Sequence, residues 1–85
     1  MKRWPEWWKW ELELESHLMK RMADRDFTDL DLRSMLSSAT SVRRDVAPGR
    51  FVVQSRLRGR RWEIIVEPEL AERLVVVITA YPVSP

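Results

Sequence analysis

The chain has no cysteine, a single histidine, only two glycines and no long hydrophobic run. Short secreted domains usually depend on disulfides, so the lack of cysteine favours a cytoplasmic location. One histidine without cysteine leaves too few ligands for a structural zinc site, and no cofactor is expected. Two separated glycines cannot build the glycine-rich loop that cradles a nucleotide phosphate.

The hydrophobic residues also exclude a membrane protein. No apolar run reaches the roughly 18 residues that a membrane-spanning helix needs. The N-terminus continues into tryptophans and acids, so a signal peptide is not expected. What is present is typical of a globular protein, with 45% hydrophobic and 33% charged residues. We therefore expect one domain over residues 1–85, with a modest core because a domain of this size buries only about 60–65% of its unfolded surface.

Positive charge is concentrated between residues 42 and 61, although the net charge of the whole chain is only +2. Arginine suits planar, paired contacts with phosphate or carboxylate. Two interpretations stay open, a solvated face or a surface for an acidic ligand such as nucleic acid. The basic residues of this stretch are Arg43, Arg44, Arg50, Arg56, Arg58, Arg60 and Arg61.

The first half of the chain predicts one strand and two helices. Apolar and charged residues alternate over residues 8–15, which favours a half-buried strand. Ser16 is the expected N-cap of a helix over residues 17–25. Thr28 and Asp31 have the spacing of a capping box, which predicts a second helix that ends near residue 39.

The second half returns to a period of two and predicts three to four antiparallel strands, over residues 42–46, 51–58, 62–67 and 74–81. Gly59 predicts a tight hairpin, and Pro68 is expected to end the third strand. The last run is apolar on both sides, as in a central strand buried on both faces. The fold expected is therefore an α+β two-layer sandwich, in the order strand, two helices, antiparallel sheet, with the helices on one face.

Alternation also divides the third of these strands between two faces. Trp62, Ile64 and Val66 are expected to face the helices, which places Glu63 and Glu67 on the opposite face. We expect these two acids to pair with arginines of the neighbouring strand. The arginines nearest the turn then remain unpaired and available for a ligand. The alternative is that Arg56 and Arg58 themselves pair with the two acids and serve only the scaffold.

A small set of side chains could carry chemistry. The chain has one histidine, His17, and histidine is the residue type whose side chain suits proton transfer near neutrality. Arg21 follows it one helical turn later. Thr79 and Tyr81 share a face of the last strand, where their hydroxyls could hold a phosphate. A surface or capping role for His17 and a place for Tyr81 at the edge of the core are the alternatives.

The N-terminal segment is rich in tryptophan. These indoles could stack on bases, although core packing or a partner interface explains them better. Residues 1–7 are expected to form a flexible or interface-forming segment, through which the chain forms a homodimer. The residues concerned are Trp4, Trp7, Trp8 and Trp10.

The segments "SHLMKRMADRDFTDLDLRSML", "GRFVVQSRLRGRRWEIIVEPE" and "LVVVITAYP" resemble a widespread family of small bacterial proteins of unknown function. The shared pattern is S/T-x-H, then R-M, a further R and a terminal V-I/V-T-x-Y, over residues 10–82. That family is distantly similar to the RelE-type ribonuclease toxins. The resemblance implies a RelE-like fold, cleavage of RNA without a metal, and a cognate antitoxin. By position it implies a site formed by His17, Arg21, Arg61, Thr79 and Tyr81.

The leading functional expectation is a toxin-like endoribonuclease in which the 2′-hydroxyl of RNA attacks the adjacent phosphate. The alternative is a non-catalytic module that binds nucleic acid or protein and in which His17 is structural. The residues expected to bind the nucleic-acid backbone are Arg43, Arg44, Arg56, Arg58 and Arg60.

Overall fold

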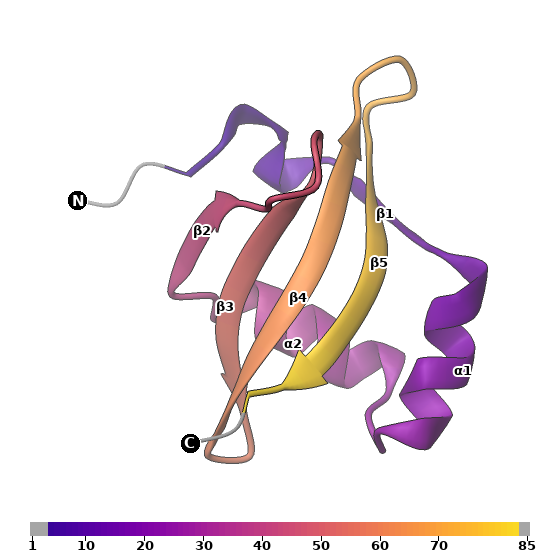
Figure 1. The fold of residues 1–85 in the computed structure, drawn as a ribbon, viewed down its shortest axis with the longest axis vertical. Helices are drawn as coiled ribbons and strands as arrows, with labels where there is room; N and C mark the ends of the chain where they lie inside the picture. Colours follow the sequence, from indigo (N-terminus) through magenta and orange to yellow (C-terminus); the bar gives the residue numbers. More distant parts are fainter. Residues whose placement is uncertain (1–3, 84–85) are drawn as a thin grey trace.

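The computed structural model of the chain describes residues 4–83. It is built on a five-stranded sheet of order β1-β5-β4-β3-β2 (Figure 1). Strands β2 to β5 form an antiparallel meander, whereas β1 pairs with β5 in parallel. The predicted α+β class is confirmed, but the sheet is mixed. The elements are a 3₁₀ helix η1 (Glu6–Lys9), β1 (Glu11–Leu14), α1 (Ser16–Asp24), α2 (Asp29–Ser37), β2 (Ser41–Arg44), β3 (Phe51–Leu57), β4 (Arg60–Glu69) and β5 (Leu74–Pro82).

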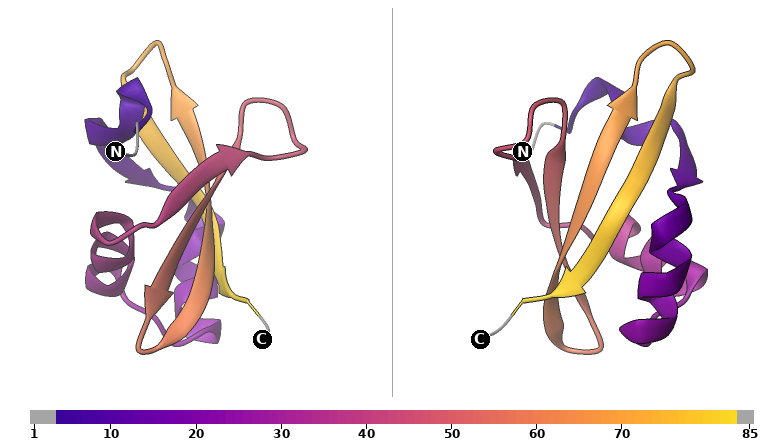
Figure 2. Two further views of the ribbon diagram at one scale, coloured as in Figure 1. Left: turned by 90° about the vertical axis from the view of Figure 1, so that its left-hand side faces the viewer. Right: turned by 45° about the vertical axis from the view of Figure 1, so that its right-hand side comes forward.

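The two α-helices occupy different places beside the sheet. Figure 1 shows α2 behind the strands and α1 beside β5. Among residues 4–83 no helix covers the other face, which we call the open face, and the loop between β2 and β3 projects on that side (Figure 2). The core lies between the helices and the covered face, and its fully buried side chains include Leu18, Leu32, Met35, Val53, Ile64, Val66 and Val77. The predicted inward orientation of Trp62, Ile64 and Val66 is confirmed.

The strand predicted over residues 8–15 is only partly correct, because the chain forms η1 before β1 begins at Glu11. Burial of indole rings accounts for the difference. Trp7 is 9% exposed and packs on Phe51, with ring centroids 5.0 Å apart. Trp4 stacks on Trp8 at 4.7 Å. Of the segment predicted to be flexible or interfacial, residues 1–3 lie outside the described residues, and Trp7 belongs to the core cluster.

Helix α1 begins one residue earlier than predicted, since Ser16 is its first residue and Glu15 is the N-cap. The Glu15 carboxylate accepts a hydrogen bond of 2.8 Å from the backbone N–H of His17. The capping box predicted for α2 is confirmed, with Thr28 and Asp31 bonded in both directions. The backbone hydrogen bond from Thr28 helps to hold the pKa of Asp31 below its ordinary value of 3.8.

The turn between β3 and β4 is the predicted tight hairpin. Arg58 and Gly59 have φ of 50° and 79°, as a two-residue turn with two left-handed positions requires. Pro68 does not end β4, which continues to Glu69. Residues 67–69 of β4 pair with β5 alone, so a proline without an N–H breaks no ladder on the other side.

The strand that is buried on both faces is β4 and not β5. Ile64, Ile65 and Val66 follow one another in β4 and are all buried, whereas Val76 and Ile78 of β5 are half-buried. The central position of β4 in the strand order explains this. No helix within residues 4–83 is long and apolar enough to cross a membrane.

Candidate functional site

Helix α1 lies along an edge of β5 that β1 leaves uncovered. The pairing of β1 with β5 ends at Val77, whose carbonyl accepts a further hydrogen bond of 3.0 Å from the N–H of Glu15. At the other end of α1, Arg25 Nη1 donates to Thr79 Oγ1 at 3.0 Å and to the carbonyl of Ala80 at 2.9 Å. The helix is therefore fastened to the strand at both ends, and its side chains have fixed neighbours on β5.

A groove of about 530 Å³ runs between α1 and the open face of β5. Side chains predicted for the catalytic site reach it from both elements, His17 and Arg21 from α1, and Thr79 and Tyr81 from β5. They are separated by more than fifty residues in the sequence, so the fold alone brings them together. The remaining lining residues are Glu15, Arg25, Arg50 and Ile78.

Half of the residues that line the α1–β5 groove are basic. His17, Arg21 and Arg25 follow one another at spacings of four, so they share one side of α1, and Arg21 lies 4.0 Å from Asp24. Arg50 adds a fourth basic group from the β2–β3 loop, with its Nε paired to Glu67 at 3.1 Å. The single acid of the lining, Glu15, caps α1. The groove consequently suits an anion that accepts several hydrogen bonds, such as a phosphodiester.

Sequence reasoning missed Arg25 and Arg50 in this site. The signal for Arg25 was present, because it continues the spacing of four from His17 and Arg21. Arg50 gave no local signal, since only the curvature of the β2–β3 hairpin brings it to the groove.

Tyr81 is held at the end of this groove by a hydrogen-bond network. Its hydroxyl donates to Glu63 Oε1 at 2.8 Å, and Arg43 Nη2 donates to Glu63 Oε2 at 3.4 Å. Burial, followed by the hydrogen bond to Glu63 and its negative charge, raises the pKa of Tyr81 above 10.0. The neutral phenol is thus the stable form at neutral pH, and its proton is directed at Glu63.

The acids of β4 pair with arginines, but not with those of β3. Glu63 pairs with Arg43 of β2 at 3.4 Å, and Glu67 pairs with Arg50 at 3.1 Å. The expected pairing with arginines of the neighbouring strand is therefore wrong, and so is the alternative in which Arg56 and Arg58 pair with these acids. Arg43 and Arg44 point to opposite faces because they are consecutive in a strand, and Arg44 lies over the ring of Phe51 at 5.9 Å.

Arg58, which was expected to remain unpaired, is anchored to the helical layer. Its Nη1 lies 3.4 Å from Asp31 Oδ1, and its Nη2 donates to the carbonyl of Asp26 at 3.0 Å. These bonds fix the β3–β4 turn against the start of α2. The physical reason is the left-handed backbone at Arg58, which turns this side chain toward α2 and away from the ladder.

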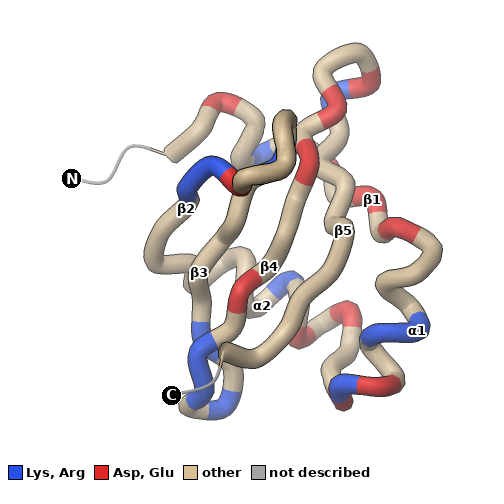
Figure 3. Tube along the Cα trace, in the orientation of Figure 1, with Lys and Arg blue, Asp and Glu red and all other residues tan. Residues whose placement is uncertain are grey.

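Three arginines at the β3–β4 turn, Arg56, Arg60 and Arg61, make no ion pair within residues 4–83, and we call them the hairpin arginines. All are exposed, and blue gathers at this end of the sheet in Figure 3. Arg56 and Arg61 stand directly opposite each other across the ladder, an arrangement of like charges that costs stability. They line a separate hollow of about 350 Å³, so Arg61 does not reach the α1–β5 groove.

No group of three or more His, Asp or Glu side chains within the described part of the chain is arranged to hold a metal ion. Comparisons with protein-family models, with curated proteins and with solved structures find no significant match.

Proposed function

We propose that the protein is a metal-independent endoribonuclease of the toxin type, with the α1–β5 groove as its active site. The observation that supports this most is the meeting of His17 and Arg21 on α1 with Thr79 and Tyr81 on β5 in one basic groove. A base, an acid and positive charge are what cleavage by the neighbouring 2′-hydroxyl requires. RNA is the substrate in this proposal, because DNA lacks that hydroxyl.

The reaction would use side chains of the groove in separate roles. His17 would accept the proton of the 2′-hydroxyl, whose oxygen then forms a bond to phosphorus while the bond to the 5′-oxygen breaks. Arg21 and Arg25 would neutralise the non-bridging oxygens, whose charge increases in the transition state. Thr79 would position the phosphate, and the Tyr81 hydroxyl would turn from Glu63 to give its proton to the departing 5′-oxygen. The products would be a 2′,3′-cyclic phosphate and a free 5′-hydroxyl.

The hairpin arginines would bind the backbone on one side of the cleaved bond. Because Arg61 lies with Arg56 and not in the groove, we assign it to a flanking phosphate and not to the transition state. Adjacent phosphates of a single strand could contact both places, since Glu63 and Tyr81 join the hollow to the groove through one hydrogen bond.

The proposal includes the family resemblance and its consequences for location and partners. Two helices that precede the antiparallel strands β2 to β5 support a RelE-like arrangement. A bacterial cytoplasm would then supply the RNA, and a cognate antitoxin would mask the basic surface. The proposal also keeps a homodimer through the N-terminal segment, residues 1–7, in which Trp4 is only half-buried.

The test is incubation of the purified chain with a short single-stranded RNA in the presence of a chelator. We expect a cyclic phosphate product, and no cleavage when the 2′-hydroxyl at the cleaved position is replaced by hydrogen. His17→Gln should lower the rate by about a hundredfold or more. Lys20→Gln, on an exposed position of α1 outside the groove, is the control and should leave the rate unchanged. Absence of cleavage by the wild type, or equal cleavage by His17→Gln, contradicts the proposal.

A second candidate is a non-catalytic module that binds RNA through the hairpin arginines. The opposed pair Arg56 and Arg61 favours it, because a backbone phosphate between the two side chains would remove their repulsion. Salt-dependent RNA binding without turnover, retained in full by a folded His17→Gln variant, would select this function over the first.

A further inference from the structure

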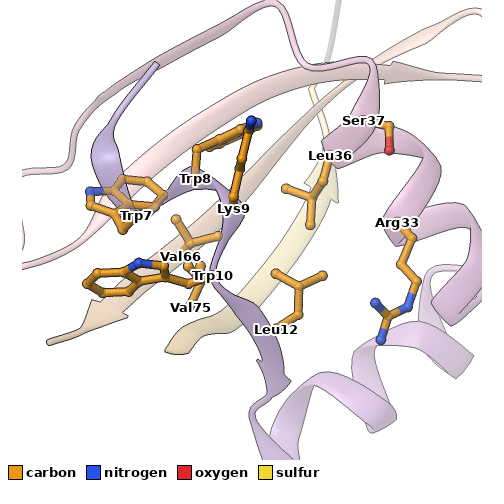
Figure 4. A pocket seen from close by; sticks show the side chains of 10 residues that line it. All are labelled: Trp7, Trp8, Lys9, Trp10, Leu12, Arg33, Leu36, Ser37, Val66 and Val75. Carbon is orange, nitrogen blue, oxygen red and sulfur yellow. The ribbon is translucent and has the colours of Figure 1, made fainter. Parts of the chain in front are cut away.

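A pocket of about 250 Å³ lies on the covered side of the sheet, between α2 and the segment of η1 and β1. Figure 4 shows the rings of Trp7 and Trp10 on one side of it and Arg33 and Leu36 of α2 on the other. None of the residues of the α1–β5 groove lines it. The pocket is therefore independent of the site proposed for RNA.

The interior of this tryptophan pocket is apolar. Val66 and Val75 form its floor and are 0% and 3% exposed. Leu12 and Leu36 lie at its sides and are only half-buried, as are Trp8 and Trp10. Burial of apolar side chains stabilises a small domain, yet around this pocket several of them stay partly open to water. They form the surface that an apolar ligand would cover.

The rim of the pocket carries charge of one sign. Lys9 and Arg33 are its only charged lining residues, and both are exposed. Lys9 makes no ion pair within residues 4–83, and Arg33 uses its Nε toward Asp29 at 3.3 Å. The Nη groups of Arg33 make no hydrogen bond within residues 4–83 and can bind an anion. An apolar body with one negative group thus matches both the interior and the rim.

We propose that the tryptophan pocket binds a small aromatic carboxylate. Its ring would lie among Trp8, Trp10 and Leu36, and its carboxylate would contact Arg33 on the α2 side of the pocket, while Lys9 adds positive charge on the Trp8 side (Figure 4). The volume lies below the roughly 300–1,000 Å³ of pockets for drug-sized ligands, so the occupant has one or two rings.

A protein occupant fits the pocket less well. A stable interface covers about 800 Å² on each partner and needs apolar surface around its centre. Here the rim is polar, and the exposed large apolar residues of the described chain lie elsewhere, at Met19, Leu30, Val46 and Leu70. Occupation of the pocket by a second copy of the chain or by a partner peptide would therefore overturn the proposal.

The experiment is a titration of the isotope-labelled chain with 3-phenylpropionate and with its neutral match, 3-phenylpropanamide, followed by the indole N–H signals in the NMR spectrum. Trp7, Trp8 and Trp10 should shift with a saturable dissociation constant that is millimolar or tighter, whereas Trp62, which does not line the pocket, should stay unchanged. The amide should bind at least about fivefold more weakly, because it makes no ion pair with the rim.

Two variants decide between this site and others. Leu36→Trp should fill the pocket and abolish binding, and Leu30→Trp, on an exposed position of the same helix, is its control. Arg33→Gln removes only the exposed ion pair with Asp29, which contributes little to stability, and it should weaken the carboxylate about fivefold without changing the amide. Unshifted indoles, equal binding of the amide, unaltered binding by Arg33→Gln, or the same shifts caused by self-association without ligand would each overturn the proposal.

Discussion

Two groups of arginines lie along the antiparallel strands, and they differ in whether β4 supplies an acid. Arg43 and Arg50 lie beside Glu63 and Glu67, so their charge is neutralised within the sheet. The hairpin arginines stand at the far end of the same strands, where β4 offers Arg61 in place of an acid. The first group joins β2 and the β2–β3 loop to the centre of the sheet. The second group contributes no such contact.

This difference separates the arginines that stabilise the fold from those that do not. An arginine that a half-buried carboxylate needs as a partner is constrained by stability. Arg56 and Arg61 stand opposite each other, and this arrangement of like charges raises the free energy of the fold. It supports our proposal that the hairpin arginines contact a ligand, and we expect opposite consequences for binding and for stability in the two groups.

The largest effect should come from replacing the three hairpin arginines together by glutamine. Removing three phosphate contacts to a single strand lowers the salt-dependence slope by about 2, which corresponds to roughly 50-fold in RNA affinity near physiological salt. Binding measured by fluorescence anisotropy at several salt concentrations checks this. The control is the triple variant Lys9→Gln, Lys20→Gln and Arg33→Gln, which removes the same charge away from the open face. An equal loss in both variants would mean that net charge, and not this surface, attracts RNA.

The next largest effect is expected on the free energy of unfolding when Glu63, the partner of Arg43, is replaced. Glu63→Ala leaves the Tyr81 hydroxyl and the Arg43 guanidinium without their partner in a half-buried place. We expect the free energy of unfolding in urea to fall by about 1–3 kcal/mol. Glu72→Ala, in the exposed turn before β5, should stay within about 0.5 kcal/mol of the wild type. A Glu63→Ala variant as stable as Glu72→Ala would show that the network contributes nothing to the scaffold.

A smaller effect distinguishes two arginines of one turn. Arg58→Gln removes the contacts with Asp31 and with the Asp26 carbonyl, and we expect a loss of about 0.5–1 kcal/mol in unfolding free energy. Arg60→Gln removes no side-chain ion pair or hydrogen bond within residues 4–83, so it should leave stability unchanged while it weakens RNA binding. Urea unfolding of both variants checks this. Equal stability of the two would mean that Arg58 does not stabilise the fold and belongs with the binding surface.

Local patterns in the sequence predicted much of the fold. The spacing of Thr28 and Asp31 predicted the capping box, Gly59 predicted the hairpin, and the alternation around Ile64 predicted which side of β4 faces the core. Each of these depends on residues that are neighbours in the chain, so their geometry follows from backbone periodicity. The resemblance implied that His17 and Tyr81 lie near each other, and both line the α1–β5 groove because α1 lies beside β5.

The contacts that decide the site were less predictable, because they join distant segments. Glu63 pairs with Arg43 of β2, two strands away, and that choice depends on strand order and on the curvature of the hairpin. Arg58 turns to α2 because its backbone is left-handed, a conformation that is uncommon for arginine and that the sequence does not predict. The parallel pairing of β1 with β5 also joins distant segments, and alternation alone wrongly predicted that the strand begins before Glu11.

The smallest expected effect is a change in the pKa of Tyr81. Tyr81 is the only tyrosine of the chain, so the ultraviolet absorbance of its phenolate reports this residue alone. Burial and the Glu63 carboxylate raise its pKa above 10.0, and the fold therefore stabilises the neutral phenol. This contribution to stability is complete below pH 10.0 and is lost as the pH rises through the higher pKa of the folded state. Glu63→Gln removes the carboxylate charge but not the burial, so the pKa should fall toward 10.0 without reaching it. Arg56→Gln, which removes a hairpin arginine, should leave the titration unchanged, because that side chain belongs to the group without a partner. A shift of equal size in Arg56→Gln would show that the two groups form one electrostatic unit.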